Sequence, residues 1–379
     1  MQSKTRLERS KKREIIFSLV SILLSSLLCL GVAEYALRWY QQSVNNSSSG
    51  DPGLLSYDSQ FGWKLTPNWQ GRHTHHDFDV QYTINKYGFR GDFPPELQTK
   101  KKKRMAIVGD SFSFGLGVND QDTFVHLLNL DNPDTEFLNL SVPGYSTDQQ
   151  LLLLKRMSAL IQADHYLLIV YLGNDLLDNM LDYPLQVEQA KPYFVIDNTG
   201  DLQLKNVPVP NLQKPAALRS RTLSSEIFGD SLMKYESKSY LRKSRLWRRI
   251  FPAESAIPNE QVIKILNARL KQHKILMSAL IDETNKHIKN QGSSFEIAML
   301  PGSSFIKLPE SYASLFQDYV RVYLTELAIQ KSIPVIDVAG EMRAQSPHQI
   351  ENWYHAYEGH LNSKGHRLLA QILKKTSVK

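Results

Sequence analysis

Apolar and polar positions form two alternating patterns from residue 104 onward. Short, nearly continuous apolar runs, typical of parallel strands buried on both faces, alternate with longer segments of helical periodicity. The predicted strands are Met105–Gly109, Glu136–Leu140, His165–Leu172, Phe295–Leu300 and Val335–Val338. The predicted helices are Thr147–Ala163, Asn259–Lys289, Tyr312–Lys331 and Ser363–Lys375. This alternation predicts a three-layer α/β domain with a parallel five-stranded sheet.

A different pattern opens the chain. Residues 15–33 form an uncharged run of 19 residues that follows six Lys or Arg in residues 1–14 and precedes the aromatic residues Tyr35, Trp39 and Tyr40. An uncharged run of this length approaches what is needed to span a bilayer, and aromatic residues suit its interface. We therefore expect one transmembrane anchor over residues 15–37. The preceding cations predict a cytoplasmic tail (1–14) and a periplasmic or otherwise extracytoplasmic remainder. A cleaved signal peptide and a buried soluble helix are the alternatives.

Other segments interrupt the α/β pattern. Residues 38–56 are polar and rich in Ser, Asn and Gly, as in a flexible linker, and residues 57–103 have the alternation of a small β-rich N-terminal extension. The main domain then covers residues 104–379, with an insertion at 176–258. The insertion contains a predicted β-hairpin, Tyr193–Ile196 with Leu202–Val207. Its basic stretch 218–251 predicts either a solvated helical face, or a lid or surface for anionic lipid or polysaccharide.

Charge and cysteine content narrow the function classes. The net charge is +7, but residues 1–14 hold six cations against two acids, so the remainder is nearly balanced. A nearly balanced domain does not indicate nucleic-acid binding. Cys29 is the only cysteine and lies within the apolar run, which excludes an intramolecular disulfide framework and disfavours a thiol nucleophile.

Four segments carry residues suited to chemistry, three directly after predicted strands and one before the last predicted helix. They are Gly109-Asp-Ser111-Phe-Ser, Asn139-Leu-Ser-Val-Pro-Gly144, Gly173-Asn174-Asp and Glu358-Gly-His360. Functional groups of parallel sheets gather at the carboxyl ends of the strands. Ser111 lacks the Gly-x-Ser-x-Gly elbow, and its loop lacks the glycine spacing and lysine of nucleotide-binding loops. A serine needs an adjacent base to act as a nucleophile, and His360 is suited to that role.

The four segments, in this order, resemble the SGNH/GDSL hydrolases over about residues 104–376. The resemblance implies a flavodoxin-like fold with Ser111 as the nucleophile and His360 as the base. It also implies an oxyanion hole formed by the backbone N–H groups of Ser111 and Gly144 and the side-chain amide of Asn174. The stretch Tyr82–Gly91 is similar to a segment in a membrane-anchored bacterial subgroup, which is related to proteins of exopolysaccharide O-acetylation.

The acid of the triad departs from the family pattern. The family commonly has Asp three residues before the histidine, where this chain has Tyr357. Glu358, two residues before His360, is the candidate orienting acid. A backbone carbonyl, a Ser-His dyad and an acid elsewhere in the chain are the alternatives.

A histidine-rich stretch offers candidate metal ligands that we interpret as strand and turn. It contains His73, His75 and His76, with Asp77 and Asp79 nearby, at a spacing that fits no standard site. We expect neither a metal nor another cofactor.

The sequence thus predicts a serine ester hydrolase or O-acyl (acetyl) transferase that works through an acyl-enzyme. Its expected substrate is an ester, an acylated envelope carbohydrate or a lipid, and its expected partners are the membrane and a membrane-bound acyl-donor protein. The alternative is a catalytically idle SGNH scaffold that binds polysaccharide or an assembly partner.

Overall fold

The computed structural model describes residues 2–45, 49–50, 52–91, 97, 100, 102–228, 259–345 and 353–377. The chain divides into two compact units, one made mainly of residues 1–47 and the other of nearly all the rest. Each is described by itself.

The first unit is the helix α1 (Gln2–Asn45). Its segment Arg13–Tyr40 is long and apolar enough to cross a membrane, although a signal sequence has the same properties. Its apolar side chains are exposed, Phe17 by 74% and Leu28 by 70%. Exposure of so many large apolar groups is costly in water and favourable in lipid. The helix includes the whole predicted span 15–37 and continues through residues assigned to the linker.

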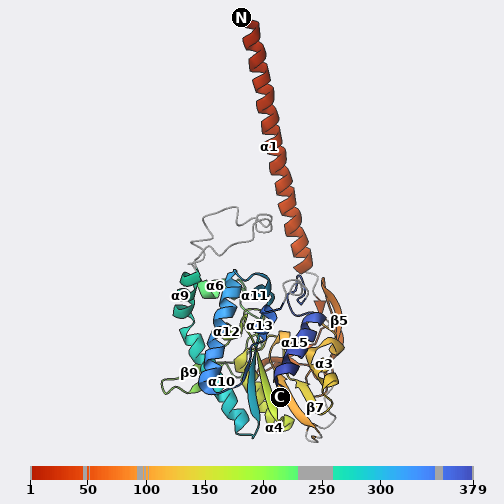
Figure 1. The fold of residues 1–379 in the computed structure, drawn as a ribbon, viewed down its shortest axis with the longest axis vertical. Coiled ribbons are helices and arrows are strands. Elements are labelled where there is room, and N and C mark those ends of the chain that lie inside the picture. Colours follow the sequence, from red (N-terminus) through yellow and green to blue (C-terminus); the bar gives the residue numbers. More distant parts are fainter. Residues whose placement is uncertain are drawn as a thin grey trace. The chain divides into compact units, whose positions relative to one another are not determined.

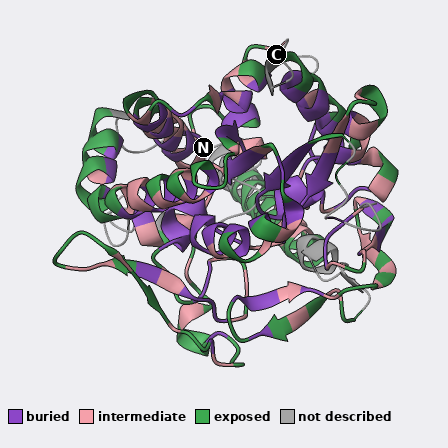
Figure 2. Ribbon diagram, turned by 90° about the horizontal axis from the view of Figure 1, so that it is seen from below, coloured by how far each residue is buried: buried purple, intermediate pink, exposed green. Residues whose placement is uncertain are grey.

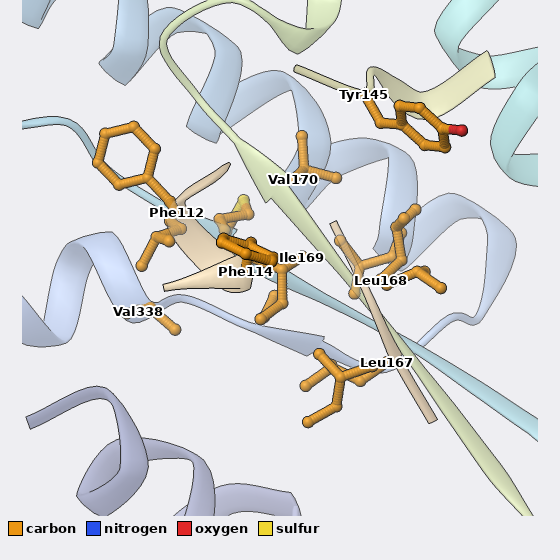
Figure 3. Packing of buried hydrophobic residues seen from close by; sticks show 14 of the residues in the cluster. Phe112, Phe114, Tyr145, Leu167, Leu168, Ile169, Val170 and Val338 are labelled. Carbon is orange, nitrogen blue, oxygen red and sulfur yellow. The ribbon is translucent and has the colours of Figure 1, made fainter. Parts of the chain in front are cut away.

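The second unit is built on a parallel five-stranded sheet, which confirms the predicted fold class. Its strand order is β12-β11-β8-β6-β7. The strands are β6 (Lys103–Val108), β7 (Thr135–Asn139), β8 (His165–Tyr171), β11 (Ser294–Leu300) and β12 (Val335–Ile336). Leu167 to Val170 of β8 are at most 1% exposed, although their side chains leave opposite faces of the strand (Figure 3). The uninterrupted apolar runs follow from this burial on both faces.

Helices cover both faces of the sheet (Figure 1). One layer holds α4 (Thr147–Ile161), α10 (Lys271–Lys289) and α12 (Tyr312–Lys331), in which Tyr323 of α12 donates to the backbone of α10. The other holds α3 (Phe124–Asp131), α13 (Val338–Arg343) and α15 (Ser363–Ser377). The predicted helix 259–289 is divided into α9 (Asn259–Arg269) and α10, because buried Leu270 has a non-helical ψ of 6°. The shorter elements are α2 (Ser111–Phe114), η1 (Asp120–Asp122), α5 (Asp175–Asp178), η2 (Ala216–Leu218), α6 (Leu223–Phe228) and α11 (Ser303–Lys307).

The N-terminal extension, residues 57–103, shares the core of the main domain. It contributes β3 (Gly62–Leu65), which pairs with β2 (Leu55–Asp58), and the hairpin of β4 (Gln70–His75) and β5 (Phe78–Thr83), to which β1 (Ser49–Gly50) adds a short strand. Phe61, Trp63 and Tyr82 are at most 3% exposed and belong to the same apolar cluster as the central sheet. Figure 2 shows the buried residues concentrated in the central strands and on the helix faces turned toward them.

The insertion places its predicted hairpin on the helical layer. Strands β9 (Tyr193–Ile196) and β10 (Leu202–Lys205) pair antiparallel, as predicted. Phe194 packs with Leu151 of α4 and with Leu276 and Leu280 of α10. Residues 229–258 lie outside the described residues, so most of the basic stretch 218–251 is not described.

Candidate active site

Ser111 lies where β6 passes into α2. Asp110 caps this short helix, because its carboxylate accepts a hydrogen bond of 3.0 Å from the backbone N–H of Phe112. A Cβ atom on Gly109 would lie 2.1 Å from Ser113 Oγ and 3.1 Å from the carbonyl oxygen of Ile169, so there is little room for a side chain at this position. The strand end thereby presents the Ser111 side chain at the carboxyl edge of the sheet, 8% exposed.

His360 reaches Ser111 from the loop that precedes α15. Its Nε2 lies 2.7 Å from Ser111 Oγ, across 249 residues of sequence. The backbone N–H of His355 donates to the carbonyl of His360 over 2.9 Å, which closes the loop on itself. The imidazole also lies against the ring of Phe112, with centroids 4.2 Å apart. The nucleophile and its candidate base are therefore in direct contact.

Glu358 occupies the other side of the imidazole. Its Oε1 lies 2.6 Å from His360 Nδ1, and its Oε2 accepts the backbone N–H of His360 over 3.0 Å. Gly359 between them has a φ of +90°, a conformation that favours glycine. A carboxylate on Nδ1 holds the proton there and leaves Nε2 able to accept the proton of Ser111.

Electrostatics keep this carboxylate ionised. Burial raises the pKa of Glu358, but its hydrogen bonds to His360 and its electrostatic interaction with that imidazole outweigh burial and hold the pKa below its usual value. Tyr357, at the position where the resemblance has Asp, is 52% exposed and its ring contacts His76.

Gly144 lies in the loop after β7. Its φ is +80°, and a Cβ there would lie 2.4 Å from Val187, so both conformation and space require glycine. Val142 donates to the carbonyl of Gly109 over 3.1 Å, which ties this loop to the start of the Ser111 turn. Within the described residues, the backbone N–H groups of Ser111 and Gly144 donate no hydrogen bond. Both donors thus remain available to an incoming oxygen.

Asn174 lies at the end of β8, on the same edge of the sheet. Its amide donates to Asp178, and its buried Oδ1 has no hydrogen-bond partner among the described residues. Burial raises the pKa of Asp178 to about 6. The end of β8 approaches the Ser111 turn through Tyr171, whose ring stacks on Phe112 at 4.0 Å. No hydrogen bond joins Asn174 to Ser111 or His360 in this part of the structure.

The other histidines have structural partners. His366, fully buried in α15, accepts the N–H of Phe124 over 3.4 Å, and burial lowers its pKa to about 3. His75 accepts the backbone N–H of Asp77, and His73 bonds Tyr82. Among the described residues, no three potential ligands gather in a way that could hold a metal ion.

Residues of the N-terminal extension hold two loops of this site, a role that sequence reasoning missed. Arg90 is 2% exposed and donates to three carbonyls at the end of α2 and in the loop after it, those of Phe114, Gly115 and Val118. The indole of Trp63 donates to the carbonyl of Pro143, next to Gly144, over 2.9 Å. The stretch Tyr82–Gly91 was noted only for its resemblance to a family segment, and nothing in the sequence indicated the contacts of Arg90.

No family model matches the chain, and no curated protein matches it. The solved structures that resemble parts of its fold include the following three. A psychrotrophic esterase EstA from Pseudoalteromonas sp. is 10% identical, with 73% of this chain and 97% of that chain covered and a TM-score of 0.36. A G-D-S-L lipolytic protein from Veillonella parvula is 13% identical, with 73% and 99% covered and a TM-score of 0.35. A lipase from a goat rumen metagenome is 13% identical, with 73% and 97% covered and a TM-score of 0.39.

Proposed function

We propose that the chain is an SGNH/GDSL-type serine ester hydrolase or O-acyltransferase. The observation that carries this proposal is the hydrogen-bonded series from Ser111 Oγ through His360 to the Glu358 carboxylate, with distances of 2.7 and 2.6 Å. A nucleophile, a base in contact with it and an acid that orients the base are the parts that acyl transfer requires.

In the proposed mechanism, Ser111 Oγ attacks the ester carbonyl carbon while its proton passes to His360 Nε2. The negative charge that develops on the carbonyl oxygen is stabilised by the N–H groups of Ser111 and Gly144 and by the amide of Asn174. One such donor is worth about 3–4 kcal/mol of transition-state stabilisation. The leaving alkoxide takes the proton from His360, and an acyl-enzyme remains on Ser111. Water then yields hydrolysis, whereas a sugar hydroxyl yields acyl transfer.

We further propose that α1 anchors the enzyme in a membrane with its N-terminus in the cytoplasm. The six cations before the apolar run support this orientation. A catalytic domain outside the cytoplasm would meet acylated carbohydrates or lipids of the envelope, and a membrane-bound acyl-donor protein would serve a transferase.

The test uses the full chain in detergent micelles, treated with a fluorophosphonate probe and assayed for turnover of p-nitrophenyl acetate. We expect labelling and turnover in the wild type and in Ser59→Ala, a control at an exposed serine. Both should be lost in Ser111→Ala and His360→Ala. Addition of oligosaccharide acceptors then distinguishes a transferase from a hydrolase. A folded wild type that shows neither labelling nor turnover would contradict the proposal and favour the idle scaffold.

A further inference from the structure

The turn of the β4–β5 hairpin contacts the loop that carries Glu358 and His360. Oδ2 of Asp77, in this turn, accepts hydrogen bonds from two consecutive backbone N–H groups, those of Tyr357 and Glu358, each over 2.8 Å. The two segments are about 280 residues apart in sequence. One carboxylate oxygen therefore fixes the backbone at the residue whose side chain orients the candidate base.

The Asp77 carboxylate is itself held in place. Its side chain is 9% exposed, and that of neighbouring His75 is 7% exposed. The backbone N–H of Asp77 donates to His75 Nδ1 over 3.2 Å, which closes the turn. The ring of His76 meets the ring of Tyr357 edge to face, with centroids 4.9 Å apart. The hairpin turn thus packs against the loop with both a charged group and a ring.

These contacts from outside add to the hydrogen bonds within the loop. Gly359 separates Glu358 from His360, and a Cβ placed on it would meet no atom within 4 Å, so side-chain packing does not restrain that position. On the opposite side, His355 Nε2 lies 3.1 Å from the carbonyl of Gly117, in the loop that Arg90 and Tyr82 also bind. Contacts from the extension therefore reach the loop from Asp77 directly and through Gly117 indirectly.

We propose that Asp77 is a positioning residue for the Glu358–His360 pair, an inference that rests on the proposed function. The hydrogen-bond partners described for Asp77 include neither Ser111 nor the imidazole of His360. Asp77 acts instead through the backbone of Glu358. Hydrogen bonds from N–H groups to an ionised carboxylate are stronger than neutral ones. Their loss lets the Glu358 carboxylate move from His360 Nδ1, and a displacement of about 1 Å at a catalytic group costs about 100-fold in rate.

The test compares Asp77→Ala, Asp77→Asn and Asp79→Ala in the full chain in detergent. Asp79 is the matched control, because it lies in the same hairpin but pairs with exposed Arg72 instead of the loop. For Asp77→Ala we expect kcat for p-nitrophenyl acetate and the rate of Ser111 phosphonylation to fall about 10–100-fold, with KM within about 3-fold. Asp77→Asn retains an acceptor oxygen but a neutral one, so kcat should fall less, by about 2–5-fold. Asp79→Ala should match the wild type.

A second readout is hydrogen exchange in the peptide 353–362, which should be faster in Asp77→Ala and unchanged in Asp79→Ala. An Asp77→Ala protein that folds and has wild-type kcat and exchange would overturn the inference while leaving the proposed function intact. If Asp77→Ala fails to fold, Asp77→Asn decides: a fall in kcat of about 2–5-fold at constant KM with faster exchange in 353–362 supports the inference, and wild-type kcat and exchange overturn it. If the wild type is unreactive, the proposed function fails, and exchange still shows whether Asp77 holds the loop.

Discussion

The β9–β10 and β4–β5 hairpins both lie outside the central sheet, and each has an aspartate in its turn that accepts hydrogen bonds from backbone N–H groups. In the β9–β10 hairpin, Asp197 accepts hydrogen bonds from Thr199 and Asp201 of its own turn. In the β4–β5 hairpin, Asp77 accepts hydrogen bonds from Tyr357 and Glu358 of a distant loop. The first carboxylate stabilises a local turn, whereas the second connects the hairpin to the candidate active site.

This difference shows that the location of an accessory hairpin determines whether it supports the candidate active site or only the packing of the domain. The β9–β10 hairpin lies on the outer side of α4 and α10, where it buries Phe194 and partly buries Ile196. The N-terminal extension lies against the loops at the carboxyl edge of the sheet, where Trp63 and Arg90 join Asp77 in binding them. Changes at the extension residues that bind these loops should therefore alter catalysis, and changes in the β9–β10 hairpin should not.

The largest expected effect is that of Glu358→Gln. Its loss of kcat is the upper limit for the loss that any change in the β4–β5 hairpin can cause by acting through Glu358. A neutral amide cannot stabilise the imidazolium that forms during attack, so we expect kcat to fall about 10³–10⁴-fold. Steady-state turnover of p-nitrophenyl acetate measures this. A Ser-His dyad would instead leave kcat within about 10-fold of the wild type.

The same variant tests how Asp77 acts. In a Glu358→Gln background, adding Asp77→Ala should cause little further loss, because both substitutions remove one interaction. If the fold-loss in kcat of the double variant equals the product of the two single fold-losses, Asp77 acts by another route, and the contrast between the hairpins is weaker.

The next effect in size is a pH dependence of stability, linked to the extension through Arg90. Burial lowers the pKa of His366 to about 3, and the nearby Arg90 guanidinium adds to this. Unfolding restores the ordinary value of 6.5, so the unfolded state binds more protons between these limits. The contribution of neutral His366 to stability is therefore full above about pH 6.5 and is lost as the pH falls toward about 3.

Chemical denaturation followed by tryptophan fluorescence checks this. Between about pH 7 and about pH 4.5, His366 should account for a loss of about 2–3 kcal/mol in the free energy of unfolding. His366→Gln, which cannot take up a proton in this range, should show a correspondingly shallower dependence. Equal slopes in the two proteins would contradict the prediction.

A smaller effect is expected at Trp63, where the extension binds the loop of Gly144. Trp63→Phe keeps an aromatic ring against Tyr145, whose centroid lies 5.6 Å away, but removes the hydrogen bond to Pro143. A less restrained oxyanion donor should lower kcat about 10-fold with little change in Tm. Trp69→Phe is the matched control, since its indole also donates to a proline carbonyl, that of Pro52. An equal fall in kcat in Trp63→Phe and Trp69→Phe would show that the hydrogen bond to the Gly144 loop has no particular importance for catalysis.

The fold could be predicted from the sequence because a strand that is buried on both faces needs apolar residues at consecutive positions, which appear as an uninterrupted apolar run. The five predicted strands correspond to the five strands of the sheet. The division at Leu270 was missed, because a leucine there carries no helix-breaking signal. The stretch with His73, His75 and His76 was interpreted as strand and turn, and the structure places it in the β4–β5 hairpin.

Contacts in the candidate site could be predicted where the two partners are close in sequence. Glu358 was chosen for its place two residues before His360, and the structure puts its carboxylate on Nδ1; its catalytic role stays a prediction. Contacts between distant segments were not predictable. Nothing local to Asp77 or Trp63 indicates that their partners lie at Glu358 and Pro143, because such pairs are set by how the extension packs on the finished sheet.

The smallest effect is expected at Asp197, and it tests the comparison from the other hairpin. Hydrogen bonds from Thr199 and from the backbone of Asp201 lower the pKa of Asp197 to about 2, so its ionised form supports the turn above its ordinary value of 3.8 and loses that support as the pH falls through about 2. Asp197→Ala should leave kcat, KM and Ser111 phosphonylation at wild-type values and should lower Tm only slightly, because the turn is exposed. The assay is the one used for Asp77→Ala, so the two aspartates are compared directly. A loss of kcat in Asp197→Ala similar to that in Asp77→Ala would mean that the two hairpins do not differ in function. Contact with the loop of Glu358 and His360 would then not be what gives Asp77 its effect.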